Sequence, residues 1–139
     1  MRVLVAGSTG AIGIPLVRQL VARGHQVTAT TRRIERAERL RGLGATVTTM
    51  DGLDAGSVGE AVARAEPDAI IHQMTALSGT PDMRHFDRWF AATNALRTTG
   101  TRNLLAAAQA AGVRRLIAQS YAGWNIDRAG RGLATENEA

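Results

Sequence analysis

Three glycines, each three residues apart, follow an apolar run near the start of the chain. Residues 7–13 read GSTGAIG, directly after RVLVA, and helical periodicity begins at Ile12. At a strand-to-helix turn, Gly7 supplies the backbone angles, Gly10 lets a pyrophosphate approach the main chain, and Gly13 lets the helix pack closely. The amino terminus of that helix adds free N–H groups and a positive dipole end. The residues that we expect to bind the phosphates are Gly7, Thr9, Gly10, Ala11, Ile12 and Gly13.

Two arginines end the second short apolar run, in the sequence TTRR at residues 30–33. Sheets that bind NAD place an acidic residue at this point to accept hydrogen bonds from the ribose hydroxyls. A carboxylate would repel the 2′-phosphate of NADP, whereas a guanidinium binds a phosphate as a bidentate fork. Arg32 and Arg33 therefore predict that NADP(H) is preferred over NAD(H). The alternative is that both arginines only begin a basic surface helix.

The elements that would position these residues alternate along the chain. Apolar and β-branched runs predict strands over residues 2–6, 25–30, 45–50, 68–72 and 114–119. Helical periodicity predicts helices over residues 12–23, 33–43 and 86–111, and a capping box from Ser57 to Glu60 predicts another that ends near Ala65. Strands separated by helices form a parallel sheet. We expect one doubly wound α/β domain of Rossmann type over residues 1–139, with about five strands in the order 3-2-1-4-5 and a loop or tail at residues 124–139.

Composition restricts the class of protein. The chain has 139 residues, 45% of them hydrophobic, which fits one domain with a buried core. It has no cysteine, no apolar stretch long enough to span a bilayer, and no signal-peptide pattern, so we expect a cytoplasmic protein without membrane contact. The net charge is +5, and all 17 basic residues are arginine. Because the arginines alternate with glutamates and aromatic residues are few, we expect no nucleic-acid partner. The three histidines show no metal-ligand spacing.

The motifs together resemble the amino-terminal part of an extended or atypical short-chain dehydrogenase/reductase, the NAD(P)-dependent epimerase/dehydratase group. The resemblance covers essentially the whole chain and rests on GSTGAIG, TTRR, DGLD, PDAIIHQMTA and GTRNLLAAAQAAGVRRLIAQS. It implies that the segment after the third strand holds the adenine, with Asp51 accepting from its amino group and Leu53 covering the ring. The residues that the resemblance assigns to the cofactor in addition to the glycine motif are Asp51, Gly52, Leu53, Gln73, Met74, Thr75 and Ala76.

Asp54 and His72 lie near these segments, and we expect both to have structural roles. Asp54 is expected to support the loop after the third strand or to cap a helix. His72 lies on a strand that we expect to be buried, and a structural histidine with satisfied hydrogen bonds is favoured there over a catalytic one.

The sequence departs from the family pattern at the long helix. The family has N-x-x-G-T there, whereas Arg97 stands three residues before Gly100. Asn94 lies about one turn earlier, on nearly the same helical face.

Catalytic residues of the family are incomplete in this sequence. The resemblance implies a Y-x-x-x-K pair and a serine after the fifth strand. The only tyrosine is Tyr121, Asn125 stands four residues after it, and the sequence contains no lysine. Ser120 is the nearest candidate for the catalytic serine. Ser120 and Tyr121 could instead close the fifth strand and shape the nicotinamide end of the cleft.

Two explanations for the missing dyad stay open. The chain is a fragment that ends before the helix carrying the tyrosine and lysine, or the complete protein lacks the dyad, as in NmrA-like proteins, which sense dinucleotides without turnover. We expect the NADP(H)-binding domain of an oxidoreductase, epimerase or dehydratase that acts on an unknown small molecule. Apolar surface left exposed in a fragment would favour self-association into a homo-oligomer.

Overall fold

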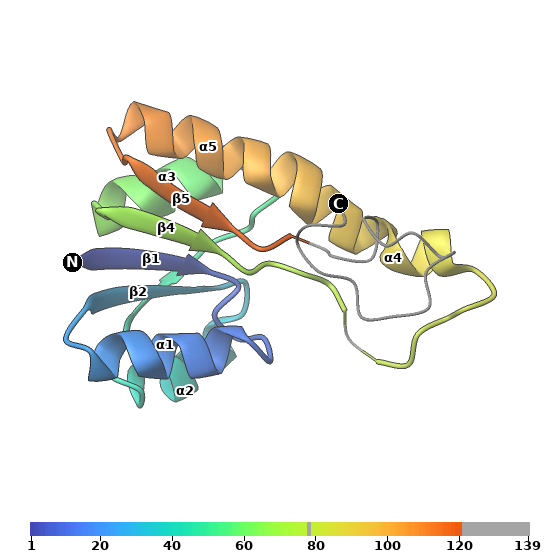
Figure 1. The fold of residues 1–139 in the computed structure, drawn as a ribbon, viewed down its shortest axis with the longest axis horizontal. Helices are drawn as coiled ribbons and strands as arrows, with labels where there is room; N and C mark the ends of the chain where they lie inside the picture. Colours follow the sequence, from blue (N-terminus) through green and yellow to red (C-terminus); the bar gives the residue numbers. More distant parts are fainter. Residues whose placement is uncertain (78, 121–139) are drawn as a thin grey trace, which may run out of the picture.

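The computed structural model describes residues 1–77 and 79–120. Strands and helices alternate along it, and Figure 1 labels most of them. The strands are β1 (Arg2–Ala6), β2 (Gln26–Thr31), β3 (Thr46–Thr49), β4 (Ala69–His72) and β5 (Arg115–Ala118). The helical elements are α1 (Gly13–Ala22), η1 (Ile34–Arg36), α2 (Ala37–Arg41), α3 (Ala55–Ala65), α4 (Phe86–Ala95), η2 (Leu96–Gly100) and α5 (Thr101–Ala110).

The five strands form one parallel sheet in the order β3-β2-β1-β4-β5, which confirms the predicted doubly wound topology. In the register, Ala6 pairs with His72, and Thr31 pairs with Thr49. The carboxyl ends of the central strands therefore meet at one edge of the sheet. The order reverses between β1 and β4, and doubly wound folds bind their ligands at that switch point.

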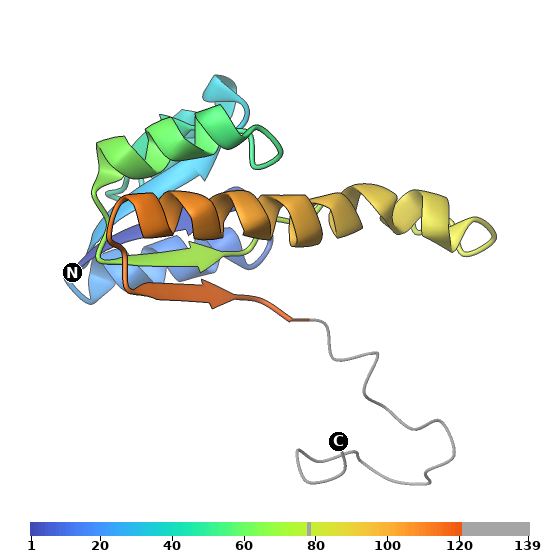
Figure 2. The same cartoon turned by 90° about the horizontal axis from the view of Figure 1, so that it is seen from above.

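Two apolar layers hold the helices to the sheet, because alternate residues of a strand face opposite sides. Val3 and Val5 of β1 face α1 and α2, where Val17 and Leu40 are fully buried or nearly so. Leu4 and the other inward residues of the opposite face pack against α3, η2 and α5. Figures 1 and 2 show these helices on the two sides of the sheet.

Two predicted boundaries are wrong, and side-chain hydrogen bonds explain both. The helix predicted over residues 33–43 is a 3-10 turn, η1, followed by the short α2, because the Thr31 hydroxyl binds the N–H and C=O of Arg33 and holds that residue extended. The capping box at Ser57 does not form. Helix α3 begins earlier, at Ala55, and Asp54 caps it by accepting a hydrogen bond from the Ser57 N–H at 3.0 Å. The expectation that Asp54 caps a helix is confirmed.

The long helix predicted over residues 86–111 is present but changes pitch in its middle. Helices α4 and α5 are joined by five residues of π-helix, η2. Leu96 and Gly100 of η2 are buried, and so is Thr93 one turn earlier, whose hydroxyl accepts from the Ala76 N–H at 3.1 Å. π-Helical turns often occur at functional sites. Figures 1 and 2 show α4 extending past the carboxyl ends of the strands.

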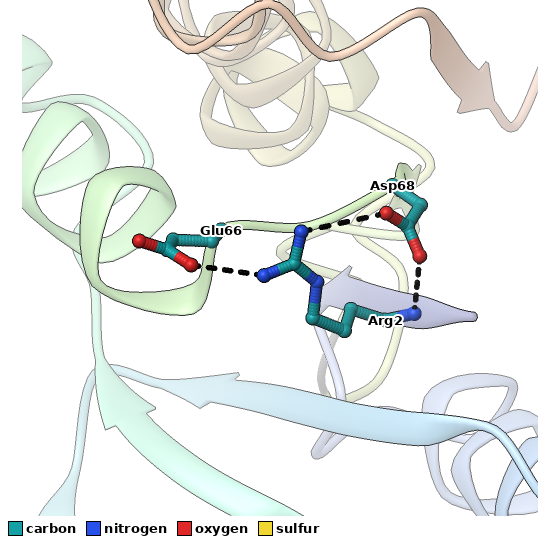
Figure 3. A network of polar contacts seen from close by, with 3 residues as sticks. All are labelled: Arg2, Glu66 and Asp68. Atoms are coloured by element: carbon teal, nitrogen blue, oxygen red, sulfur yellow. Dashed lines mark hydrogen bonds and ion pairs between the residues drawn. The ribbon is translucent and has the colours of Figure 1, made fainter.

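The amino-terminal edge of the sheet is closed by an ionic network. The Arg2 guanidinium lies 2.9 Å from the Glu66 carboxylate and 3.5 Å from that of Asp68, and the Arg2 N–H donates to Asp68 at 2.7 Å (Figure 3). That backbone hydrogen bond is the main reason why the pKa of Asp68 is lowered. A cavity of about 720 Å³ adjoins this network, between the strand starts and the ends of α3 and α5. It lies at the opposite edge from the glycine motif.

Candidate functional site

The glycine motif forms the turn from β1 into α1, and two of its glycines are required by the protein itself. Gly7 has a φ of +92°, and a Cβ there would lie 2.6 Å from the Gln73 main chain. A Cβ on Gly13 would overlap the Gly7 carbonyl oxygen and lie 2.7 Å from the Ser8 carbonyl carbon. These contacts let the start of α1 approach the carboxyl ends of β1 and β4 closely.

Gly10 is different, because the fold does not require a glycine there. It is exposed, its φ is not in the left-handed region, and a Cβ would have one neighbour, the Gly7 carbonyl oxygen, at an ordinary 3.5 Å. The space beside Gly10 is therefore open to a ligand. No side chain caps the first turn of α1. Ile14 and Leu16 donate their N–H groups to the Gly10 and Ile12 carbonyls, and Pro15 has no N–H, so this turn offers an anion the Gly13 N–H and the positive end of the helix dipole.

Buried hydroxyls fix the turn to the neighbouring strand, and the sequence analysis did not single them out. Ser8 is fully buried; its hydroxyl donates to the Val5 carbonyl at 2.6 Å and accepts from the Thr30 N–H at 3.1 Å. The Thr30 hydroxyl in turn accepts from the Gly7 N–H at 3.4 Å. A serine inside a glycine motif was the available signal, because a short hydroxyl side chain bonds nearby backbone well.

Arg32 and Arg33 follow the carboxyl end of β2, and both side chains are exposed. Arg33 has extended backbone angles, φ −123° and ψ 113°, so the two arginines lie on a loop rather than in a helix. A cavity of about 480 Å³ opens between the glycine motif and α2, lined by Thr9, Ile14, Glu35, Arg36, Arg39 and Leu40. The cations that line this cavity are Arg36 and Arg39, whereas Arg32 and Arg33 lie on the exposed loop that precedes it in the chain.

The segment after β3 forms a tight turn that presents Asp51 and Leu53. The Asp51 carboxylate accepts from the Leu53 N–H at 3.0 Å, and Leu53 is 44% exposed. Gly52 is buried, and its carbonyl accepts from the Asn103 amide of α5 at 3.0 Å. Asn103 is a second residue that the sequence analysis missed, since nothing local indicates a partner 51 residues away.

His72 is the structural histidine that we expected. The ring is 4% exposed; its Nδ1 accepts from the Met74 N–H at 3.1 Å, which leaves Nε2 to donate to the Leu96 carbonyl at 3.2 Å. Burial is the main cause that lowers the pKa of His72, and the nearby charge of Arg97 lowers it further. The neutral ring therefore joins the end of β4 to η2.

The four residues after His72 offer different groups to the site. Met74 is 8% exposed, packs in the core and donates its N–H to His72, whereas Thr75 is exposed. The Gln73 side-chain oxygen is buried and, among the residues that the structure describes, has no hydrogen-bond partner. A hydroxyl or amide donor from a ligand would satisfy that oxygen.

The remaining predicted residues follow β5 or belong to the long helix. Ser120 follows β5 and is exposed, and Tyr121 lies outside the described residues. On the long helix Asn94 is exposed, whereas Arg97 is half-buried. The two residues therefore differ in burial, although the sequence placed them on nearly the same face.

The open space at Gly10, the uncapped start of α1 and the buried Gln73 oxygen fit a dinucleotide laid along the carboxyl edge of the sheet. The NAD(P)H-binding family matches residues 7–138. The chain belongs to this family. Its relatives and structural neighbours confirm the resemblance to Rossmann proteins of the epimerase/dehydratase type.

A 3-diazoavenalumate denitrifying reductase from Streptomyces is 49% identical over 122 residues, which cover 88% of this chain and 38% of that protein. WbmG from Bordetella bronchiseptica, solved in complex with NAD and UDP, is 28% identical with a TM-score of 0.67, over 85% of this chain and 36% of that one. A UDP-glucose 4-epimerase from Thermus thermophilus, in complex with NAD, is 28% identical with a TM-score of 0.68, over 84% and 36%. This NAD(P)H-binding chain thus spans less than two fifths of the length of these relatives.

Other kinds of site receive no support from the described part of the NAD(P)H-binding chain. Within residues 1–77 and 79–120, no group of three or more histidine or acidic side chains could hold a metal ion. No helix in the same ranges has the length and apolar character needed to cross a membrane.

Proposed function

We propose that this chain is the NADP(H)-binding part of an oxidoreductase of the epimerase/dehydratase type. The observation that carries the proposal is Gly10: the fold tolerates a side chain there, so the glycine serves a ligand that approaches the main chain. The 49% identity to a denitrifying reductase favours a reductase over an epimerase, and the substrate would be a small organic molecule, as in that relative.

The dinucleotide would lie along the carboxyl edge, with its pyrophosphate over the glycine motif. The amino terminus of α1 would donate the Gly13 N–H to the phosphates and direct its positive dipole end at them. Asp51 and Leu53 would hold the adenine. The buried side-chain oxygen of Gln73, a residue whose main chain lies beside Gly7, would accept from the nicotinamide half of the ligand.

The preference for NADP(H) rests on the loop after β2. Arg32 and Arg33 are exposed, and the Thr31 hydroxyl fixes the backbone of Arg33 through two hydrogen bonds of 3.0 and 3.1 Å. A fixed backbone reduces the entropy lost when a guanidinium binds a phosphate. The sequence TTRR also lacks the acidic residue that would bind the ribose of NAD.

The bound cofactor would supply or accept a hydride. The residues of this chain would bind it, orient it at the switch point and exclude water from one face of the ring. Because the sequence contains no lysine, we propose that the complete protein draws its proton-transfer group from outside these 139 residues.

A fluorescence titration with NADPH and NADH tests the cofactor proposal. The matched variants are R32A/R33A, which removes both guanidinium groups after β2, and R18A, which removes an exposed guanidinium from α1. We expect the double variant to weaken NADPH about tenfold or more, as the loss of a charge-assisted contact requires, while NADH affinity stays unchanged. Equal affinities of the parent chain for both cofactors would refute the preference.

A further inference from the structure

The cavity of about 720 Å³ lies at the amino-terminal edge of the sheet, where the starts of β1, β4 and β5 meet the ends of α3 and α5 (Figure 1). Small-molecule sites in proteins have volumes of about 300–1,000 Å³. Ala63, Ala111 and Val113 contribute apolar surface to the lining, and charged side chains contribute the rest of its character. Because the glycine motif lies at the opposite edge of the sheet, a cofactor bound there would leave this cavity free.

Arg114 lines the cavity and lacks the partner that its position offers. Extended by one residue, the register of β1, β4 and β5 places Asp68 between Arg2 and Arg114. Arg2 engages both oxygens of that carboxylate, through its N–H at 2.7 Å and its guanidinium at 3.5 Å (Figure 3). Within residues 1–77 and 79–120, the Arg114 guanidinium has neither a hydrogen bond nor an ion pair. Its charge is therefore available to a ligand.

The charges of the lining favour a ligand with a single negative charge. The Glu66 and Asp68 carboxylates are both paired with Arg2, at 2.9 and 3.5 Å. Arg114 and Arg115 remain, so the five charged side chains of the lining have one positive charge in excess. Because like charges repel, the two carboxylates disfavour a doubly charged phosphate more than a carboxylate. A carboxylate also matches the planar fork of a guanidinium.

A backbone carbonyl in the lining lacks the donor that a helix normally provides. In an α-helix the C=O of Ala63 would accept from residue 67, but Pro67 has no N–H. The Glu66 N–H, which is the other local donor, binds the Val62 carbonyl at 3.0 Å instead. Ala63 lies in the last turn of α3, where the negative end of the helix dipole also favours a donor. An N–H group of a ligand would therefore complement this carbonyl.

We propose that the cavity binds a small carboxylate that also carries an amide N–H group and an apolar side chain, as N-acylated amino acids do. Arg114 binds the carboxylate, the Ala63 carbonyl accepts from the N–H, and Ala111 and Val113 contact the apolar part. The site lies at the opposite edge of the sheet from the glycine motif. It is therefore independent of the proposed function, and its test needs no cofactor.

N-acetyl-leucine is a suitable probe, titrated into the ¹⁵N-labelled chain, with the neutral N-acetyl-leucinamide as its matched control. We expect the acid to give saturable shifts at the amides of residues 62–66 and 111–115. The leucinamide should bind about fivefold more weakly, as the loss of one partly exposed ion pair requires. R114M should weaken the acid by a similar factor, and R114K should restore part of the affinity. R102M removes an exposed arginine of α5 that does not line the cavity, and it should change nothing.

Two further comparisons test the other contacts. Ala63 is exposed, so the larger side chain of A63L would enter the cavity without disturbing the core, and it should weaken the acid and the leucinamide alike. N-acetyl-N-methylleucine, which has no N–H, should bind more weakly than N-acetyl-leucine.

Several results would overturn the proposal. They are the absence of saturable shifts at the cavity with N-acetyl-leucine, equal affinities for the acid and the leucinamide, and an R114M variant that binds the acid as well as the parent chain. An equal loss in R102M would assign the effect to the overall charge of the protein and would count against the site in the same way. Displacement of the acid by an equal concentration of inorganic phosphate would show that the cavity does not select a carboxylate.

Discussion

Replacing Gly10 with alanine tests whether the glycine is required by a bound ligand or by the fold. An added Cβ would contact one protein atom at 3.5 Å, and the backbone of Gly10 is not left-handed. Such a Gly-to-Ala change stabilises a fold by about 0.4–1 kcal/mol, because it lowers the conformational entropy of the unfolded chain. We therefore expect G10A to unfold at the same temperature as the parent chain or a few degrees higher. Each kcal/mol of added stability raises the melting temperature by about 2–4 °C.

Cofactor binding by G10A should fall although its stability does not. The methyl group would occupy the space in which a phosphate approaches the main chain, and one lost charge-assisted hydrogen bond costs about 1.5–3 kcal/mol. That corresponds to an NADPH dissociation constant about 10- to 150-fold higher. Equilibrium fluorescence titration measures the affinity, and calorimetry measures the melting temperature on the same sample.

Two further glycines serve as controls for G10A. A Cβ on Gly13 would overlap the Gly7 carbonyl, so G13A should lose about 1–3 kcal/mol of stability, as overpacking does. A Cβ on Gly59, inside α3, would meet nothing within 4 Å, so G59A should gain stability and keep its affinity for NADPH. If G10A melts early and binds NADPH like the parent chain, the argument that the glycine serves a ligand is wrong.

Substitutions at three other residues test separate parts of the account. H72L leaves the buried Met74 N–H and Leu96 C=O without partners, at about 1–3 kcal/mol each, and urea unfolding should show the loss. Because the pKa of His72 is lowered in the fold, the unfolded chain binds the proton at a higher pH than the folded chain does. The parent chain should therefore lose stability as the pH falls below about 6.5, and H72Q should lose less. Equal pH profiles of the two proteins would contradict this reasoning. N103L removes the amide that holds the Gly52 carbonyl and should weaken NADPH severalfold, while unchanged affinity would show that this hydrogen bond does not position the adenine segment. D54A removes the cap of α3 and should cost about 1 kcal/mol of stability with NADPH affinity unchanged; a loss of affinity would instead assign Asp54 to the site.

The sequence was sufficient for the topology because the relevant signals are local. Alternating apolar runs mark the strands, and the crossover rule then leaves few arrangements of a parallel sheet. The structural roles of Gly7 and Gly13 could be predicted for the same reason, since the strand, the turn and the helix that they connect follow one another directly in the chain. His72 was interpreted correctly as structural, because buried strands rarely carry a free polar ring.

Side-chain hydrogen bonds account for what the sequence did not predict. Asp54 rather than Ser57 starts α3, because several residue types can cap a helix and the spacing of charged residues does not choose between them. The Ser8 and Asn103 contacts join segments 22 and 51 residues apart, so no window of sequence contains both partners. The π-helical turn at η2 depends on packing against Met74 and Gly52, which the helical period alone does not encode.

Chemical-shift mapping of ¹⁵N-labelled protein during titration with NADP⁺ tests the central claim most directly. We predict saturable shifts at the amides of residues 7–13, 32–33, 51–53 and 73–76, which together trace the carboxyl edge of the sheet. Saturation should occur at one NADP⁺ per chain. Shifts confined to the cavity beside Arg2 and Arg115, or no saturable shifts, would contradict the claim that a dinucleotide binds over the glycine motif.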